Sequence, residues 1–369
     1  MSSLYSFLDT PSLIIDLDQT KRNIKMMQKK ADNYGMDLIP HTKTHKMPYF
    51  AKMQIKEGAK GIAVAKIGEA EVMAEHGIEN IFIANEIVGI SKYKRIKSLH
   101  KKIDISVGVD NRVQIDQIEK VFKNSNSPLE VLIEYEVGEN RSGVITDEQL
   151  SELVNYIKEK KKVKLRGIFS HEGHTYKAKN RNIAKELAEK SYRKTIRAAN
   201  IIREIGIDID TISVGATPSV MNGAYVEGIT DFRVGTYIFM DMGQAGAIDS
   251  FERCAATVLA TVISKPTEDR VVLDAGAKAL VPQNRDSGIC ATNGFGYVKN
   301  SDNVYVNRLF DEHGVINDKK FQNEVSIGEK VEIIPAHICP TVNLYDEAQI
   351  VSEGKLVKTV PILARGKIE

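Results

Sequence analysis

The segment Pro40-His41-Thr42-Lys43-Thr44-His45-Lys46 holds several ionisable side chains at close spacing. It follows a short apolar stretch typical of a strand and precedes a helix expected to begin at Pro48. If the chain stays extended, His41, Lys43 and His45 lie on one face. A lysine crowded by other cations in a partly dry site has a lowered pKa and becomes a nucleophile suited to forming a Schiff base with an aldehyde. The alternative interpretation is a solvated basic turn.

A second reactive pair, His337 and Cys339, lies far downstream in Pro335-Ala336-His337-Ile338-Cys339-Pro340-Thr341. On a strand, these two side chains would face the same way. An imidazole and a thiolate together suit zinc. A catalytic zinc usually keeps three protein ligands, so water, substrate or a third side chain has to complete this site. The alternative is that Cys339 is a small buried apolar residue.

The elements that must position these groups follow a repeating pattern. Short apolar segments alternate with helical segments, and after the first strand eight such units follow in tandem. This pattern predicts a parallel sheet covered by helices, and the count of eight predicts a (β/α)₈ TIM barrel. A doubly wound open sheet is the alternative, but no Gly-x-Gly-x-x-Gly follows an early strand. The predicted strands span residues 37–40, 61–65, 80–84, 104–107, 130–136, 165–170, 211–214 and 232–239.

Barrels of this type carry their active site at the C-terminal ends of the strands, with a phosphate site after strands seven and eight. Gly215, Ala216 and Thr217 follow the seventh predicted strand. Small residues let the backbone approach an anion, and Thr217 suits the start of a helix whose free N–H groups bind phosphate. Gly235 and Thr236 add N–H donors from the eighth strand. A capped helix without a ligand is the alternative for each loop.

Further candidates occupy the same edge of the predicted barrel. His171 and Tyr176 follow the sixth strand, and His171 is expected either to contact an aromatic ring or to be a satisfied polar group at a strand end. Arg233, in the eighth strand, is expected to reach a pyridine nitrogen and keep it unprotonated. Arg141 and Tyr237 lie near the same edge, without an assigned role.

The region after residue 250 changes character. Alternating apolar segments separated by turn residues predict an antiparallel β domain without clear helices. The first strand, at residues 12–17, is expected to pack there because chain ends often lie close together. The predicted division is a barrel at 12–245 and a β domain at 250–369, possibly joined by residues 1–11.

Composition narrows the function classes. The chain has 369 residues, and its 51 basic side chains nearly balance 49 acidic ones, so neither nucleic acid nor an anionic membrane is an expected partner. Three scattered cysteines are too few for a disulfide framework, which favours a reducing, cytoplasmic location. No apolar run approaches the roughly 20 residues needed to span a bilayer, and the N-terminus does not read as a signal peptide.

Taken together, the motifs resemble those of the D-serine dehydratase and D-threonine aldolase family, pyridoxal-phosphate enzymes with the alanine racemase-like fold. The resemblance implies that Lys43 is the Schiff-base lysine and that His337 and Cys339 bind metal. Cysteine in this pair implies a zinc-dependent dehydratase, whereas the aldolases more often carry aspartate with manganese or magnesium. A homodimer is also implied. The motifs are 41–46, 173–176, 215–219 and 337–341.

The resemblance implies a pyridoxal-phosphate- and metal-dependent lyase acting on a β-hydroxy D-amino acid, with D-serine converted to pyruvate and ammonia. Lys43 would remove the α-proton, with its pKa lowered towards the operating pH. One alternative is D-threonine aldolase, with His174 as base, and another is a 3-hydroxy-D-aspartate dehydratase or aldolase. A non-catalytic pyridoxal-phosphate-binding protein is a further alternative, against which the chain beyond residue 250 argues.

Overall fold

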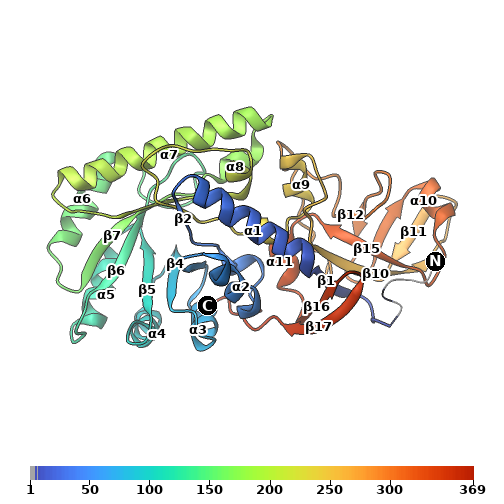
Figure 1. Cartoon of the computed structure of the whole chain (residues 1–369), viewed down its shortest axis with the longest axis horizontal. Coiled ribbons are helices and arrows are strands. Elements are labelled where there is room, and N and C mark those ends of the chain that lie inside the picture. The colour runs from blue at the N-terminus through green and yellow to red at the C-terminus, as the bar shows by residue number, and fades with distance from the viewer. Residues whose placement is uncertain (1–4, 6) are drawn as a thin grey trace.

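The computed structural model describes residue 5 and residues 7–369. The prediction that residues 1–11 join the β domain therefore lies outside the described residues at positions 1–4 and 6. The chain forms two lobes side by side (Figure 1). One lobe is a sheet of parallel strands with helices around it, and the other is a second sheet built mainly from the last third of the chain. Among the described residues, no helix has both the length and the apolar character needed to cross a membrane.

The first lobe is the expected (β/α)₈ barrel. Its eight strands are all parallel, in the order β2-β9-β8-β7-β6-β5-β4-β3. The curled sheet closes where the N–H of Ala63 donates to Pro40 O (2.9 Å) and that of Lys60 to Leu38 O (3.1 Å). The strands are β2 Asp37–Leu38, β3 Ile62–Val64, β4 Asn80–Glu86, β5 Asp104–Val109, β6 Leu129–Glu134, β7 Val163–Phe169, β8 Thr211–Val214 and β9 Asp231–Phe232.

The helices of this lobe cover the outside of the sheet and belong to one large apolar core. Side chains alternate along each strand, so Ile81 and Ile83 pack outward in that core while Phe82 belongs to a small cluster inside the barrel. Polar N-caps start several helices, as Asn111 does for α5. The helices are α1 Leu17–Asn33, α2 Pro48–Glu57, α3 Ile67–Glu75, α4 Ile90–His100, α5 Arg112–Phe122, α6 Asp147–Lys158, α7 Arg181–Glu204, α8 Thr217–Met221 and α9 Met242–Ile248.

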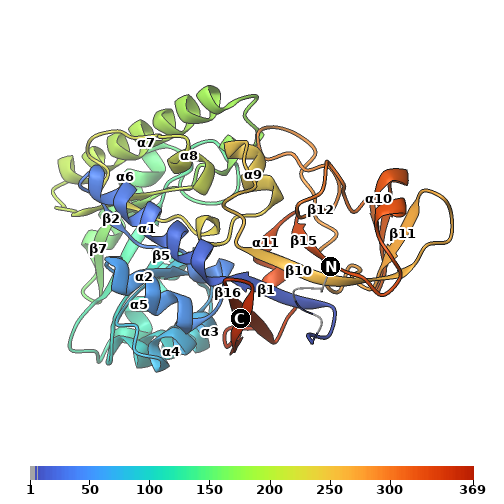
Figure 2. The ribbon, with the colours of Figure 1, turned by 45° about the vertical axis from the view of Figure 1, so that its right-hand side comes forward.

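The second lobe is a mostly antiparallel sheet that includes the first strand of the chain (Figure 2). β1 lies between β10, to which it is antiparallel, and β16, to which it is parallel. The elements are β1 Ser12–Asp16, β10 Ala256–Ser264, β11 Arg270–Leu273, β12 Gly296–Val298, β13 Arg308–Leu309, β14 Gly314–Asn317, α10 Lys319–Glu324, β15 Lys330–Pro335, α11 Ile338–Val342, β16 Glu347–Ser352 and β17 Lys355–Pro361.

Several predicted elements differ from the structure. The eighth barrel strand ends at Phe232, and the rest of the predicted strand is a short irregular segment (233–235) followed by the 3₁₀ helix η3 (Thr236–Ile238). The second lobe also contains short helices where none was expected, and α11 carries Cys339.

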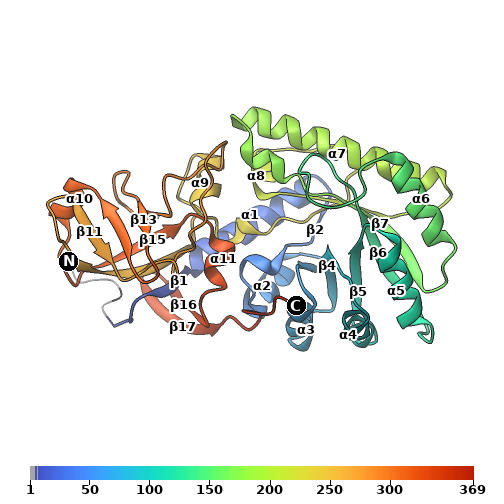
Figure 3. The ribbon, with the colours of Figure 1, turned by 180° about the vertical axis from the view of Figure 1, so that it is seen from behind.

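The chain end returns from the second lobe to the barrel, and it lies beside α3 when the molecule is seen from behind (Figure 3). The N–H of Ala364 donates to Lys46 O at 3.0 Å, and a guanidinium nitrogen of Arg95 lies 3.6 Å from Glu369 Oε1. The C-terminal segment therefore ties the second lobe to the loop after β2, where Lys43 stands.

A buried ion pair fixes the same loop to the barrel. Lys46 Nζ lies 2.6 Å from Glu69 Oε1, and both side chains are almost fully buried. The second carboxylate oxygen of Glu69 accepts the N–H groups of Ala65 (2.7 Å) and Lys66 (3.2 Å). One carboxylate thus holds the loops after β2 and β3 together.

Replacing Glu69 by alanine should reduce the free energy of unfolding by about 3–5 kcal/mol, because it leaves a buried ammonium group unpaired. Glu71→Ala is the matched control: it removes a partly exposed ion pair with Arg95 and should cost about 1 kcal/mol or less. Urea denaturation followed by circular dichroism measures both changes. Equal effects of the two substitutions would contradict the structural importance of Glu69.

Candidate functional site

A cavity of about 390 Å³ opens at the C-terminal ends of the barrel strands. This is the edge at which the barrel fold predicts an active site. Every residue predicted to bind the cofactor lies in its wall, although these residues come from widely separated parts of the chain. The lining residues include His41, Lys43, His171, Tyr176, Gly215, Ala216, Thr217, Arg233, Gly235 and Thr236.

Lys43 lies in a 3₁₀ helix, η1 (Thr42–Thr44), rather than in an extended segment. The predicted common face of three residues is therefore only partly right. His41 and Lys43 line the cavity, but His45 turns into the core, where its Nε2 lies 3.3 Å from Gln54 Oε1. The tight turn at Thr42–Thr44 breaks the two-residue alternation on which the prediction relied.

The charges at this wall suit a reactive amine. The Lys43 side chain is accessible to solvent within the cavity, but protein surrounds it, and this burial lowers its pKa from 10.5. Cys339 opposes the effect, while Arg141 and Arg233 add to it. Burial also lowers the pKa of His171 well below 6.5, and Lys43 and both arginines lower it further. The imidazole therefore stays neutral, and the Lys43 amine loses its proton more easily than a lysine in water.

The loop after β8 was predicted to bind phosphate through Gly215 and Ala216. Their N–H groups instead donate to the buried carboxylate of Glu172, at 3.3 and 2.7 Å. The N–H groups of Thr217, Gly235 and Thr236 make no hydrogen bond to any residue that the structure describes. Glu172 thus shapes the loop, and these three N–H groups are the donors left for an anion.

Arg233 is buried in the cavity wall and held in one orientation. Its two terminal nitrogens donate to Ser213 Oγ (2.8 Å) and Ser170 O (2.9 Å), and its guanidinium lies 4.9 Å from the ring centre of Phe169. Arg141 is more exposed and pairs with Glu134 (3.1 Å). The cavity therefore contains two fixed cations beside the amine of Lys43.

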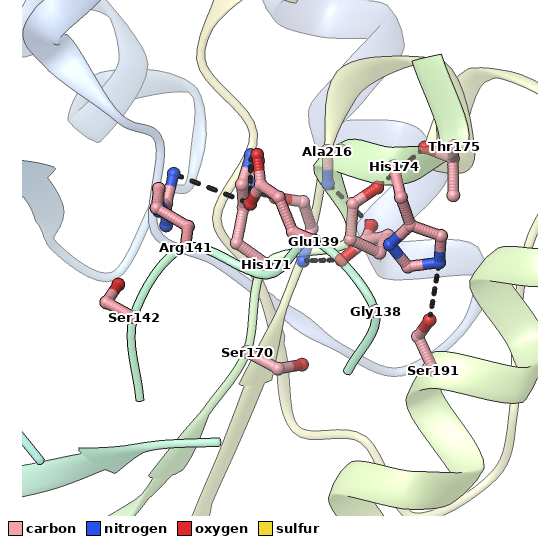
Figure 4. A network of polar contacts seen from close by, with 12 residues as sticks. Gly138, Glu139, Arg141, Ser142, Ser170, His171, His174, Thr175, Ser191 and Ala216 are labelled. Atoms are coloured by element: carbon pink, nitrogen blue, oxygen red, sulfur yellow. Dashed lines mark hydrogen bonds and ion pairs between the residues drawn. The ribbon is translucent and has the colours of Figure 1, made fainter. Parts of the chain in front are cut away.

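Two predicted site residues on the segment after β7, His171 and His174, point in different directions (Figure 4). Its 3₁₀ helix, η2 (Gly173–Lys177), follows His171 and places Tyr176 in the cavity wall. His174, proposed as a base, is not a wall residue, and its Nε2 lies 3.4 Å from Ser191 Oγ on α7. The turn of η2 directs this side chain to the helix layer, so the structure does not bring His174 to the cavity.

The downstream pair approaches Lys43 from the second lobe. Cys339 Sγ lies 3.3 Å from Thr44 Oγ1 and 3.7 Å from Thr236 Oγ1. His337 precedes α11 and Cys339 lies in its first turn, so the expected strand is absent here, yet the two side chains still contact each other. Burial alone would raise the pKa of Cys339, but His337, Thr44 and Lys43 lower it to about 7.

Sequence reasoning missed the acidic residues of the site. Glu172 follows β7, Glu86 and Glu134 end β4 and β6, and Glu139 lies between Arg141 (3.5 Å) and His171 (3.9 Å). Their position at or just after the ends of predicted strands could have identified them as site residues. Carboxylates at that edge of the barrel are expected to pair with the cations predicted there.

Glu172→Ala should reduce the free energy of unfolding by about 3 kcal/mol or more, because it leaves two buried N–H groups and the Tyr192 hydroxyl unpaired. Tyr192→Phe removes only one of these donors and should cost about 1 kcal/mol. Equilibrium denaturation compares the two. A Glu172→Ala protein as stable as the Tyr192→Phe protein would show that the carboxylate does not hold the loop.

Comparison with known proteins agrees with this arrangement. The family model for the alanine racemase N-terminal domain matches residues 15–243, and that for a putative serine dehydratase domain matches residues 255–351. A D-threonine aldolase from Arthrobacter is 34% identical over 364 residues, covering 97% of this chain and 93% of that protein. A D-threo-3-hydroxyaspartate dehydratase from Delftia is 28% identical over 369 residues, covering 95% and 96%.

A solved structure extends the likeness to three dimensions. The crystal structure of D-threonine aldolase from Filomicrobium marinum superposes with a TM-score of 0.89 at 30% identity, covering 99% of this chain and 98% of that one. The resemblance inferred from the motifs is thus confirmed. This chain belongs to the alanine racemase-like family, with an alanine racemase N-terminal domain followed by a serine dehydratase domain.

Proposed function

We propose that the protein is a pyridoxal-phosphate- and metal-dependent lyase acting on a β-hydroxy D-amino acid, and that D-serine, converted to pyruvate and ammonia, is its first candidate substrate. The main support is that Cys339, from the second lobe, lies 3.3 Å from Thr44, the neighbour of Lys43, and 3.7 Å from Thr236 in the cavity wall. A serine dehydratase domain in the second lobe agrees with dehydration.

The cavity fits the cofactor on three counts. Lys43 offers an amine whose pKa burial lowers, as an aldehyde-binding lysine requires. Thr217, Gly235 and Thr236 offer unpaired N–H groups for a phosphate. The remaining wall residues, His171, Tyr176 and Arg233, would enclose the ring, and the guanidinium of Arg233 disfavours a proton on a nearby ring nitrogen.

The metal is supported by the chemistry of the donors. Imidazole and thiolate suit zinc, with manganese or magnesium as alternatives. No group of three or more His, Cys, Asp or Glu side chains able to hold a metal occurs within the described part of the chain. His337 and Cys339 would therefore bind the ion together with water or substrate. Gln283, whose Oε1 lies 3.1 Å from His337 Nδ1, orients that imidazole.

The residues of the chain divide the reaction between them. Bound pyridoxal phosphate supplies an electron sink that acidifies the substrate Cα–H, and a metal ion supplies Lewis acidity at the β-oxygen. Nζ of Lys43 takes up the α-proton, and its lowered pKa allows the amine to be neutral beforehand. Arg141 and Arg233 keep their positive charge and attract an anionic substrate.

Retro-aldol cleavage of D-threonine is the second candidate, and the 34% identical aldolase from Arthrobacter favours it. A 3-hydroxy-D-aspartate is a third candidate substrate, supported by the Delftia dehydratase. The proposal also includes zinc as the metal, assembly as a homodimer and a cytoplasmic location, for the reasons given in the sequence analysis. It includes the domain bounds 12–245 and 250–369 for the same reasons.

Lys43→Ala should remove the visible absorbance of bound cofactor and reduce turnover of D-serine by at least about 10²–10⁴-fold, because it deletes the proton acceptor. Lys52→Ala, at an exposed position of α2, is the control and should leave both unchanged. Absorbance spectra and a coupled pyruvate assay measure the effects. Full activity in Lys43→Ala would refute the assignment.

Cys339→Ala should abolish the difference in turnover between metal-supplemented and chelator-treated protein, because one of the two donors is lost. Cys254→Ala, which changes a buried thiol in another apolar cluster, should keep that difference.

Product analysis on a panel of D- and L-hydroxy amino acids tests the reaction itself. Pyruvate and ammonia from D-serine support dehydration, whereas glycine and an aldehyde as the only products would replace it with the aldol reaction.

A further inference from the structure

Two glutamates, Glu86 and Glu134, stand in the cavity wall without a role in the proposed reaction. Each is the last residue of its barrel strand, β4 or β6. Glu134 shares the inner face of β6 with Leu132 by two-residue alternation. β4 is irregular between Ile83 and Glu86, so Glu86 is placed at the barrel mouth by its position in the cavity wall. Both carboxyl groups are thus directed into the barrel mouth.

Gly108, on the intervening strand β5, is paired in register with Glu86. On its other side Gly108 pairs with Leu132, two residues before Glu134, so this position of β5 places no side chain beside Glu86. A Cβ at this position would lie 2.9 Å from the Phe169 ring, so the strand cannot carry a larger residue without displacing that ring. The geometry therefore lets the two carboxyl groups approach each other across β5.

The two carboxyl groups have different partners. Glu134 accepts hydrogen bonds from Arg141 Nη2 (3.1 Å) and Ser142 Oγ (2.8 Å). Oε1 of Glu86 is buried, and no donor among the described residues reaches it. Its neighbour is the Glu134 carboxyl group itself. Two carboxylates cannot bond to each other unless one carries a proton, and an unpaired buried carboxylate is costly.

We propose that Glu86 is a protonated positioning residue, whose carboxylic acid donates a hydrogen bond to Glu134 and thereby fixes the partner that holds Arg141 in the cavity wall. Glu134 remains ionised and pairs with the arginine. This proposal depends on the proposed function in one respect: it takes Arg141 to be a cation that binds substrate or cofactor.

The charges around the pair agree with this division. Burial first, then the hydrogen bond and charge of Glu134 and the charge of Asp110, together raise the pKa of Glu86 to about 8. Burial alone would raise the pKa of Glu134, but bonds from Glu86, Ser142 and Arg141 lower it. At neutral pH, the proton therefore resides on Glu86. Above about pH 8, both groups are ionised and repel each other, and Glu86 competes for the cation of Arg141.

Infrared difference spectroscopy of the holoenzyme tests the proton directly. The wild-type minus Glu86→Gln spectrum at pH 6 should contain the carbonyl stretch of a protonated carboxylic acid, and this band should disappear as the pH rises through about 8. Glu186→Gln, at an exposed position of α7, is the control and should remove no such band. A difference spectrum without an acid band at pH 6 overturns the proposal, whatever the activity of the protein.

Cofactor affinity and kinetics test the positioning role. Glu86→Gln keeps a donor to Glu134, so its cofactor affinity and KM should stay within about twofold of wild type at pH 7. Glu86→Ala should weaken cofactor binding or raise KM about tenfold, the equivalent of one hydrogen bond. kcat/KM of wild type should fall above about pH 8, and that of Glu86→Gln should not. Identical pH profiles would overturn the positioning role. Absence of turnover with every D-amino acid would refute the proposed function but leave the infrared result standing.

Discussion

Thr44 and Cys339 meet across the boundary between the two lobes, with 3.3 Å between Oγ1 and Sγ. The loop that carries Lys43 is held from three sides: by this contact, by the Lys46–Glu69 ion pair, and by the N–H of Ala364 on Lys46 O. Loops at the mouth of a barrel are otherwise open to water. The second lobe therefore helps to hold the loop that carries the amine, and Cys339 opposes the lowering of the Lys43 pKa by burial.

Carboxylates organise the mouth of the barrel behind the cations. Glu69 joins the loops after β2 and β3, Glu172 shapes the loop after β8, and Glu134 holds Arg141. Each uses both of its oxygens, and each is almost fully buried. Buried carboxylates are tolerated only when donors or cations surround them. Each of these glutamates therefore needs the loop groups that bond to it, and those loops need the glutamate. The Glu134–Arg141 pair also offsets part of the mutual repulsion among the basic groups of the cavity.

The sequence was sufficient for the barrel, because each strand is a short apolar run and helices separate the strands at regular intervals. The helix α2 begins at Pro48, as predicted. Local turns were not predictable in this way. The 3₁₀ turn at Thr42–Thr44 and the helix at Ile338–Val342 depend on packing between the lobes, and strand alternation therefore gave the wrong geometry around Lys43 and Cys339. Glu172 was missed because its donors come from another loop, more than forty residues along the chain.

The protonation of the cavity limits which residues can act as bases. Burial lowers the pKa of both His41 and His171 well below 6.5, and the neighbouring cations lower it further, so each imidazole is already neutral and holds its place through a hydrogen bond. Such a group accepts a proton poorly because the resulting charge would lie among arginines. Lys43 is then the best placed acceptor for an α-proton. A retro-aldol reaction would need a second base at the β-oxygen, and since His174 faces α7, a different wall residue would have to supply that base.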